Sequence, residues 1–251
     1  MMSKQFSIVL IAVSFSAALT AQQSAAPTPA APAPRAPRTA YYIDASVLDA
    51  SILLPEPPAQ GSAASQADLA EVHSVEKSRT AAQITAAKAD DREEDMFAFK
   101  TVFGPGFNPD ALPLTAALGA HVKNEQSVVG AQLKGTFQRP RPYQTDNSLH
   151  PVCVLKTEHD SYPSGHAFTG YLEAFTLAEI APDRRYEILA RADDYAHNRV
   201  VCGVHFPSDV EASRRVAYAV FGYMIATPRF QKDLALARDE MRRAGLVGSK
   251  N

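Results

Sequence analysis

Residues 112–137 read LPLTAALGAHVKNEQSVVGAQLKGTF, and this stretch does most to set the fold class. Apolar side chains recur along it at helical spacing, at Leu114, Leu118, Val122, Val129 and Leu133. Pro113 fits the first turn of a helix, and Pro140 and Pro142 would stop it. We therefore predict one long helix here, with an apolar face that packs against a core.

Other long stretches are also rich in good helix formers and poor in glycine. Residues 66–88 contain no proline and predict another helix. Pro182 fits the first turn of a further one, and Thr227 with Pro228 forms a cap and first turn for a final helix that Gly245 ends. Alternating strand patterns are nearly missing, so we predict an all-α single domain of about six to seven helices.

The composition limits the classes of partner. The chain has 251 residues, of which 46% are hydrophobic and 21% charged, enough for one sizeable core. Its 25 Lys and Arg nearly balance its 27 Asp and Glu, so no basic field covers the protein to hold nucleic acid or an anionic membrane. Any bound anion must be held by a local site.

The N-terminus has the pattern of a secretory signal peptide. Lys4 precedes an apolar run over residues 6–19, small residues follow it, and no acidic residue occurs before Asp44. The run is shorter than the ~20 residues that span a bilayer, which argues against a membrane anchor. We expect export, and therefore a periplasmic or secreted protein.

The chain is expected to have three parts. We predict a signal peptide over residues 1–21, a Pro/Ala-rich linker over 22–40 and a folded domain over 41–251. Ala26 offers a second position for cleavage of the signal. The linker composition cannot bury apolar surface and favours extended polyproline geometry.

A first cluster of cations occupies residues 134–142, which read KGTFQRPRP. Lys134 lies near the end of the predicted long helix, and Arg139 and Arg141 follow among prolines. Arginine offers a planar fork of donors and lysine a point charge, so the cluster could clamp a phosphate or a carboxylate. A solvated basic helix end that complements the helix dipole is the alternative.

A second cluster is Ser164-Gly165-His166, followed by AFTGYLEAFTLAEI with helical periodicity. Ser164 is suited to cap that helix, and Gly165 would let an anion approach the backbone N–H groups at the positive end of the dipole. His166 would then lie beside the anion. An ordinary cap followed by a partly buried histidine is the alternative interpretation.

A third cluster runs from Arg199 to Asp209. Pro207 favours a helix start near Ser208, which places His205 in the preceding loop and Asp209 in the first turn. An Asp four residues after a His can accept the proton of one ring nitrogen and leave the other free as a nucleophile or base. A structural His–Asp hydrogen bond and metal ligation are the alternatives, although no two-His helix motif or paired cysteines accompany the cluster.

In this order the clusters resemble the signature of the type 2 phosphatidic-acid phosphatase superfamily, Lys-x6-Arg-Pro, Pro-Ser-Gly-His and Ser-Arg-x5-His-x3-Asp. The matching residues are Lys134, Arg141, Pro142, Pro163, Ser164, Gly165, His166, Arg199, His205 and Asp209. One departure is Asn198, where the family has Ser. Within the superfamily the chain is most similar to the secreted class A bacterial nonspecific acid phosphatases over about residues 41–244, including LLPEPP at 53–58 and NRVVCGVHFPSDVEA at 198–212.

The resemblance implies a helical fold related to that of the vanadium haloperoxidases, and an exported acid phosphatase of broad specificity for phosphate monoesters. It implies His205 as the nucleophile that becomes a phosphohistidine, Asp209 as its support and His166 as the general acid and base. The phosphate would be held by Lys134, Arg141, Ser164, Gly165 and Arg199. The family spacing selects Arg141 over Arg139. No metal or cofactor is implied, and transfer of phosphate to other alcohols could accompany hydrolysis.

Two cysteines are too few for a disulfide scaffold or a four-cysteine zinc site. Export would let Cys153 and Cys202 form one disulfide beside the second and third clusters. Two buried free thiols are the alternative.

Three rival functions can be weighed against this resemblance. A vanadate-dependent haloperoxidase uses the same constellation, with vanadate in place of phosphate. An integral-membrane lipid phosphatase would need several apolar spans of ~20 residues, and none follows the signal. A catalytically inactive exported binding protein is the third. The expected partners are small-molecule phosphate monoesters, without nucleic acid or membrane after signal cleavage, and the helical surfaces could support a homo-oligomer.

Overall fold

The computed structural model describes residues 38–44 and 50–248. The expected signal peptide, residues 1–21, and all but the end of the expected linker over 22–40 lie outside the described residues.

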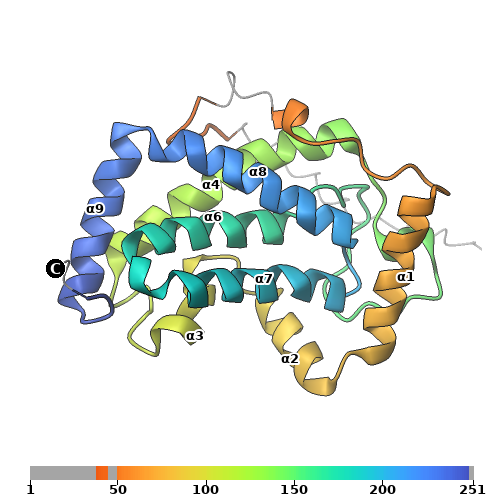
Figure 1. The fold of residues 1–251 in the computed structure, drawn as a ribbon, viewed down its shortest axis with the longest axis horizontal. Helices are drawn as coiled ribbons and strands as arrows, with labels where there is room; N and C mark the ends of the chain where they lie inside the picture. Colours follow the sequence, from red (N-terminus) through yellow and green to blue (C-terminus); the bar gives the residue numbers. More distant parts are fainter. Residues whose placement is uncertain (1–37, 45–49, 249–251) are drawn as a thin grey trace, which may run out of the picture. The chain divides into compact units, whose positions relative to one another are not determined.

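The described residues form helices joined by loops, without a strand among them (Figure 1). The longer helices are α1 (Ala63–Ser78), α2 (Ala81–Asp90), α4 (Pro113–Phe137), α6 (Gly165–Ile180), α7 (Arg185–Val201), α8 (Pro207–Ile225) and α9 (Pro228–Arg243). Short ones are η1 (Ala50–Leu53), η2 (Met96–Phe99), α3 (Lys100–Phe103), α5 (Pro142–Thr145) and η3 (Pro182–Arg184). The all-α prediction is confirmed, and the short helices raise the count above the expected six to seven.

One expected helix is divided in two. The sequence predicts a continuous helix over residues 66–88, but the chain leaves the helix between α1 and α2, at Arg79 and Thr80. The Thr80 hydroxyl accepts a hydrogen bond from the Gln83 backbone N–H, and the Gln83 side chain accepts one from the Thr80 N–H. This capping box starts a new helix despite the high helix propensity on both sides.

Prolines open several helices, as the sequence predicts. Pro113, Pro207 and Pro228 each lie in the first turn of their helix. Pro182 opens only the short helix η3, and the longer helix expected from it begins separately as α7 at Arg185. Pro142, expected from the sequence to stop the long helix, instead opens α5. The long helix ends earlier, at Phe137, because Gln138 adopts a left-handed conformation with φ 43°.

Helix α6 lies at the centre of the core, packed against α4, α7 and α8 (Figure 1). Its side chains Phe168, Leu172 and Leu177 are fully buried. Gly170 allows a close approach to α7, since a Cβ atom there would lie 2.7 Å from Cδ1 of Tyr195. This close packing fixes the start of α6 relative to the end of α7. The start of α6 carries the second cluster, and the end of α7 leads into the third.

The start of the folded unit is fastened to α4 and α9. The backbone N–H groups of Tyr41 and Tyr42 donate to the buried carboxylate of Glu125, on α4. The Tyr42 hydroxyl donates to Asp233, on α9, at 2.9 Å. The segment around Tyr41 and Tyr42 is thus part of the fold, although it has no regular secondary structure.

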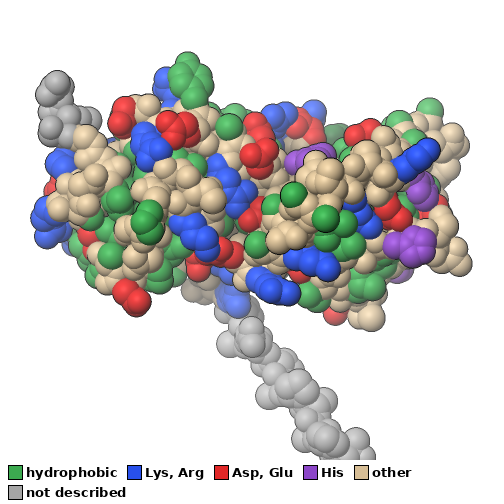
Figure 2. Space-filling model, turned by 90° about the horizontal axis from the view of Figure 1, so that it is seen from below, with side chains coloured by type: hydrophobic (Ala, Val, Ile, Leu, Met, Phe, Trp, Pro, Cys, Tyr) green, Lys and Arg blue, Asp and Glu red, His purple; other side chains and the backbone are tan. Residues whose placement is uncertain are grey.

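Charged side chains of both signs are interspersed over the face of the molecule seen in Figure 2, in keeping with the near-neutral composition. Within residues 38–44 and 50–248, no helix has the length and apolar character needed to cross a bilayer.

Candidate active site

A cavity of about 510 Å³ brings the three clusters together. Its walls come from the end of α2 and the following loop, from α4, from the loop between α5 and α6, and from the ends of α6 and α7. The predicted site residues that line it are Lys134, Arg141, Gly165, His166, Arg199 and His205. Ser164 and Asp209 do not line the cavity, but Asp209 faces the cavity residue His205 at 3.4 Å, and the Ser164 N–H donates to the Asp209 backbone oxygen.

His205 lies in the loop between α7 and α8, and only 2% of its surface is exposed. Its Nδ1 faces the Asp209 carboxylate at 3.4 Å, and its Nε2 faces Nη1 of Arg141 at 3.1 Å. Because a guanidinium group can only donate, Nε2 must carry the lone pair, which assigns the proton to Nδ1. The ring is thus oriented with its basic nitrogen towards the cavity.

The surroundings also keep this imidazole neutral. Burial lowers the pKa of His205 well below 6.5, and the positive charges of Arg141, Lys134 and Arg199 lower it further. A neutral imidazole has a free electron pair at the acidic pH where most histidines are charged.

Asp209 is held from several sides in the first turn of α8. It is completely buried and accepts hydrogen bonds from the Ser161 hydroxyl and the Phe206 backbone N–H, at 2.6 and 2.8 Å. Nη1 of Arg139 lies 2.6 Å from its other oxygen. Burial raises the pKa of the Asp209 carboxyl, and Arg139 and the hydrogen bonds oppose that rise. These contacts fix the carboxylate against His205.

The two arginines of the first cluster have separate positions. Arg141 lines the cavity, whereas Arg139 lies behind it, where it pairs with Asp68 and Asp209 and stacks on the Phe206 ring at 4.1 Å. Arg139 therefore supports the carboxylate beneath His205 and does not reach the cavity.

The cations of the cavity are paired with carboxylates. Arg141 donates through Nε to Asp160 at 2.8 Å, and Arg199 pairs with Asp91 at 2.8 Å. Nζ of Lys134 donates to the Asp160 backbone oxygen and lies 3.8 Å from its carboxylate. Burial lowers the pKa of Lys134 to about 8, so its amine is still charged at acidic pH.

The start of α6 supplies backbone donors. The Ser164 side chain caps the helix by accepting from the Ala167 N–H, and the Ser164 N–H donates to the Asp209 backbone oxygen at 3.2 Å. Gly165 follows and lines the cavity. The positive end of the helix dipole is therefore turned towards the cations, where an anion is favoured.

His166 faces acceptors on both ring nitrogens. Its Nδ1 lies 2.8 Å from the Glu94 carboxylate, and its Nε2 lies 3.3 Å from the Asp91 backbone oxygen. Burial lowers the pKa of His166, and Glu94 opposes this. Two acceptors around one ring favour the doubly protonated form, which is the form that can donate a proton.

The arrangement agrees with comparisons to known proteins. Residues 112–233, which contain all three clusters, match the PAP2 superfamily. A nonspecific acid phosphatase of Providencia stuartii is 31% identical over 202 residues, which cover 75% of this chain and 79% of that protein. The chain belongs to the PAP2 superfamily.

Other PAP2 proteins are similar over shorter stretches. A nonspecific acid phosphatase of Salmonella typhimurium is 36% identical over 152 residues, and the matched stretch spans 57% of this chain and 59% of that protein. A transmembrane PAP2-type phosphatidylglycerolphosphate phosphatase of Bacillus subtilis has a similar fold, with a TM-score of 0.50 at 18% identity over 70% of this chain and 88% of the other. The chain thus spans only part of the length of the Salmonella relative.

The departure from the PAP2 signature at Asn198 has its own contact. The Asn198 amide donates to the buried carboxylate of Asp90 at 2.8 Å, and Arg191 pairs with the same carboxylate. Asn198 is therefore engaged away from the PAP2 cavity, which it does not line.

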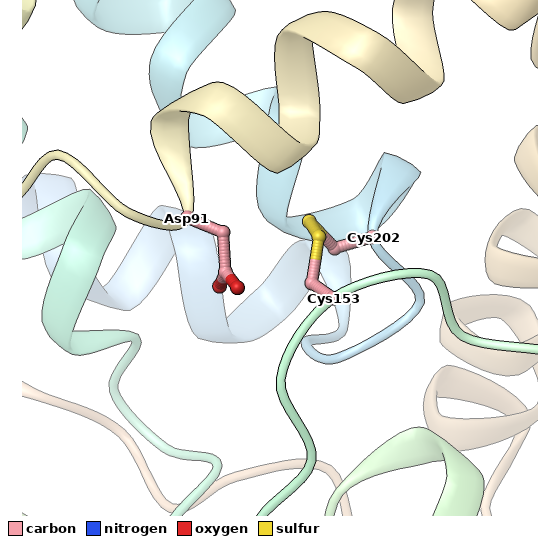
Figure 3. A group of neighbouring side chains, drawn as sticks. All are labelled: Asp91, Cys153 and Cys202. Atoms are coloured by element: carbon pink, nitrogen blue, oxygen red, sulfur yellow. A yellow bond between two sulfur atoms is a disulfide. The ribbon is translucent and has the colours of Figure 1, made fainter.

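The two cysteines form a disulfide beside the PAP2 cavity, with their Cα atoms 5.3 Å apart. Figure 3 shows the carboxylate of Asp91 next to the bridge. The three side chains lie close enough together to surround a metal ion, but sulfur atoms in a disulfide are not thiolate ligands. The Asp91 oxygens are already bound to Arg199 and to the Val154 N–H. The group therefore does not fit a metal site.

Sequence reasoning missed the acidic and hydroxyl partners of the PAP2 signature. Asp91, Glu94 and Asp160 line the cavity, and Ser161 binds Asp209. In the sequence, Asp160 and Ser161 stand just before Pro163 of the second cluster. Asp91 and Glu94 stand in the acidic run DDREED at 90–95. Neither position follows a spacing rule that would distinguish these residues from ordinary polar residues of the surface.

Proposed function

We propose that this chain hydrolyses phosphate monoesters through a phosphohistidine intermediate, with broad specificity and without a metal ion. The observation that carries the proposal is the neutral His205, whose Nε2 lone pair faces a cavity lined by Lys134, Arg141 and Arg199. A nucleophile beside three fixed cations is suited to attack a phosphoryl group, whose charge those cations would stabilise.

In the first step the lone pair of His205 Nε2 forms a bond to phosphorus as the ester P–O bond breaks. The electron pair of that bond leaves on the ester oxygen, which takes the proton of His166 Nε2 and departs as the alcohol. The imidazole of His205 becomes positively charged, and Asp209 balances this charge through the Nδ1 hydrogen bond.

In the second step a water molecule attacks phosphorus and transfers a proton to the now neutral His166. The electrons of the P–N bond return to His205, and phosphate is released. Attack by another alcohol in place of water would transfer the phosphoryl group, so phosphotransfer belongs to the same proposal.

The phosphoryl oxygens would be held by fixed donors. Lys134, Arg141 and Arg199 surround the cavity, and the Gly165 N–H lies at the start of α6, next to the cap Ser164. Stabilisation of charge on the equatorial oxygens is the main requirement of phosphoryl transfer. Since the side chains supply it, the proposal needs no metal ion.

We also propose that the protein acts outside the cytoplasm, in the periplasm or the medium. The signal-peptide pattern supports export, and so does the disulfide between Cys153 and Cys202, because such bonds persist mainly in oxidising compartments.

The test is hydrolysis of p-nitrophenyl phosphate by the wild type and by the variants H205A and H197A, each with and without EDTA. H205A should lose at least about 10³-fold in kcat/KM, because no other group can take the place of the nucleophile. His197 is exposed and outside the cavity, so H197A should match the wild type.

An active H205A variant would overturn the nucleophile assignment, and loss of wild-type activity in EDTA would overturn the metal-independent mechanism. Rapid mixing followed by alkaline quenching should trap a base-stable, acid-labile phosphoenzyme in the wild type and in H197A, but not in H205A.

A further inference from the structure

Glu94 joins His166 to a lysine on another helix. Its Oε1 lies 2.8 Å from Nδ1 of His166, at the start of α6, and its Oε2 lies 3.2 Å from Nζ of Lys123, on α4. One carboxylate thus bridges two helices from the loop after α2. Neither Glu94 nor Lys123 belongs to the three-part signature.

The bridge determines which nitrogen of His166 can react. With Nδ1 bound to the carboxylate at 2.8 Å, Nε2, which has only the longer 3.3 Å contact with the Asp91 backbone oxygen, is the nitrogen that would exchange a proton with a leaving group. A carboxylate partner also favours the charged imidazolium and holds the ring in one orientation. Lys123 limits the positions that the Glu94 carboxylate can take.

We propose that Glu94 is the positioning residue of the acid step, and that Lys123 orients Glu94. The proposal rests on the proposed function, in which His166 protonates the leaving alcohol. Glu94 acts through His166 and does not itself touch the reacting atoms.

Other charged or titratable groups also face this pair. Arg199 of α7 lowers the pKa of His166 by its positive charge, and Tyr195 of the same helix stacks on the imidazole with ring centroids 6.3 Å apart. The remaining groups are Asp91 at the end of α2, Lys134 of α4, Glu173 of α6 and His205 before α8. Arg199 disfavours the imidazolium of His166, and so would a charged His205, whereas Glu94 is the main group that supports it.

The electrostatics have a definite sign. Burial lowers the pKa of His166, and the hydrogen bond to Glu94 is the largest contribution in the opposite direction. The hydrogen bond to His166 in turn lowers the pKa of Glu94 to about 2, so this carboxylate stays ionised over the acidic range. Without it, the pKa of His166 falls further, and less of the enzyme carries the catalytic proton at any given pH.

The experiment compares E94Q with the wild type on two substrates that differ in their need for an acid. The p-nitrophenolate group leaves without a proton, whereas the alkoxide of glycerol 2-phosphate needs one. We expect E94Q to lose about 10²-fold in kcat/KM on glycerol 2-phosphate and less than about 10-fold on p-nitrophenyl phosphate. The falling limb of its pH profile should move to lower pH.

K123M should lower kcat/KM on the two substrates in the same pattern as E94Q, but by a smaller factor. E93Q is the matched control, because Glu93 is adjacent in sequence but pairs with Lys100 at 2.8 Å and does not line the cavity. E93Q should retain the wild-type ratio between the two substrates and the wild-type pH profile.

An equal loss on both substrates with an unmoved pH profile would mean that Glu94 only supports the fold, and the inference would be wrong. It would also be wrong if the kinetics of E94Q were indistinguishable from those of E93Q. Failure of the proposed function looks different, since the wild type would then hydrolyse neither substrate. Thermal unfolding of each variant shows whether the compared proteins are folded.

Discussion

At the scale of single residues, two histidines of one cavity are both buried but have different charged partners. His205 lies among Lys134, Arg141 and Arg199, which disfavour a charge on its ring. His166 faces Glu94, which favours one. The same side chain can thus serve as a neutral nucleophile at one position and as a proton donor at the other.

The pH profile of kcat/KM should be bell-shaped with its maximum below pH 6.5. The rate rises with pH as His205 loses its proton, and this occurs far below 6.5 because its pKa is strongly lowered. It falls as His166 loses its proton, also below 6.5 since burial lowers that pKa too. Initial rates with p-nitrophenyl phosphate measure the profile, and a flat one from about pH 4 to 9 would contradict the paired roles.

The residues of the signature could be predicted because their chemistry needs fixed local spacings, such as the three residues between His205 and Asp209. Their partners could not. Asp160 reaches Arg141 from a loop, and Asp91 reaches Arg199 from the end of α2, through contacts that only the packing of helices creates. Arg139 illustrates the same limit, since the sequence left its role undefined and the fold places it behind Asp209.

At the scale of elements, the packing of α6 on α7 sets the separation of the candidate catalytic groups. The start of α6 carries Gly165 and His166, and the last turn of α7 carries Arg199. Their close contact at Gly170 and Tyr195 keeps both helix ends at the wall of the same cavity.

The variant G170A should destabilise the protein by about 1–3 kcal/mol, the usual effect of an oversized group in a packed core. Its Cβ atom would meet the Tyr195 ring at 2.7 Å, which forces the helices apart. Urea unfolding measures the loss, and kcat/KM should fall with it. In G222A, on the exposed side of α8, the added methyl meets nothing within 4 Å, so this control should be unchanged or up to about 1 kcal/mol more stable. Equal stability of the two variants would rule out the packing argument.

Helix positions were predictable where periodicity and prolines agreed, as in α4 and α9. The division between α1 and α2 was missed because the propensity of the alanines outweighed a short capping pattern. Thr80 and Gln83 have the spacing of a capping box, so the signal was present in the sequence. Its effect depends on the chain turning there to pack α2 against α7, which is a tertiary contact.

At the scale of the whole molecule, the disulfide ties the loop before α6 to the end of α7. Around it, the Val152 N–H donates to the Cys202 oxygen, and the Val154 N–H donates to Asp91. Arg199 contacts both Asp91 and the Cys202 sulfur. The bridge is therefore part of the framework that holds Arg199, a cation at the wall of the cavity.

The double variant C153S/C202S should lose about 4 kcal/mol of unfolding free energy, from the entropy of a loop of 49 residues. KM should rise because Arg199 and Asp91 lose a neighbour on one side. Urea unfolding and steady-state kinetics measure the two effects, and the wild type in reductant should approach the variant. If the midpoint of urea unfolding and KM are both unchanged in the double variant, the disulfide does not help to hold Arg199 in place.

The carboxylates beside the cavity cations also bear on the release of the product. Asp160 and Asp91 offset much of the charge of Lys134, Arg141 and Arg199, so free phosphate meets a much weaker field than three bare cations would give. Differential binding requires affinity for the transition state, not for the product. If the proposed function holds, inorganic phosphate should therefore inhibit only weakly, so that hydrolysis continues as the product accumulates.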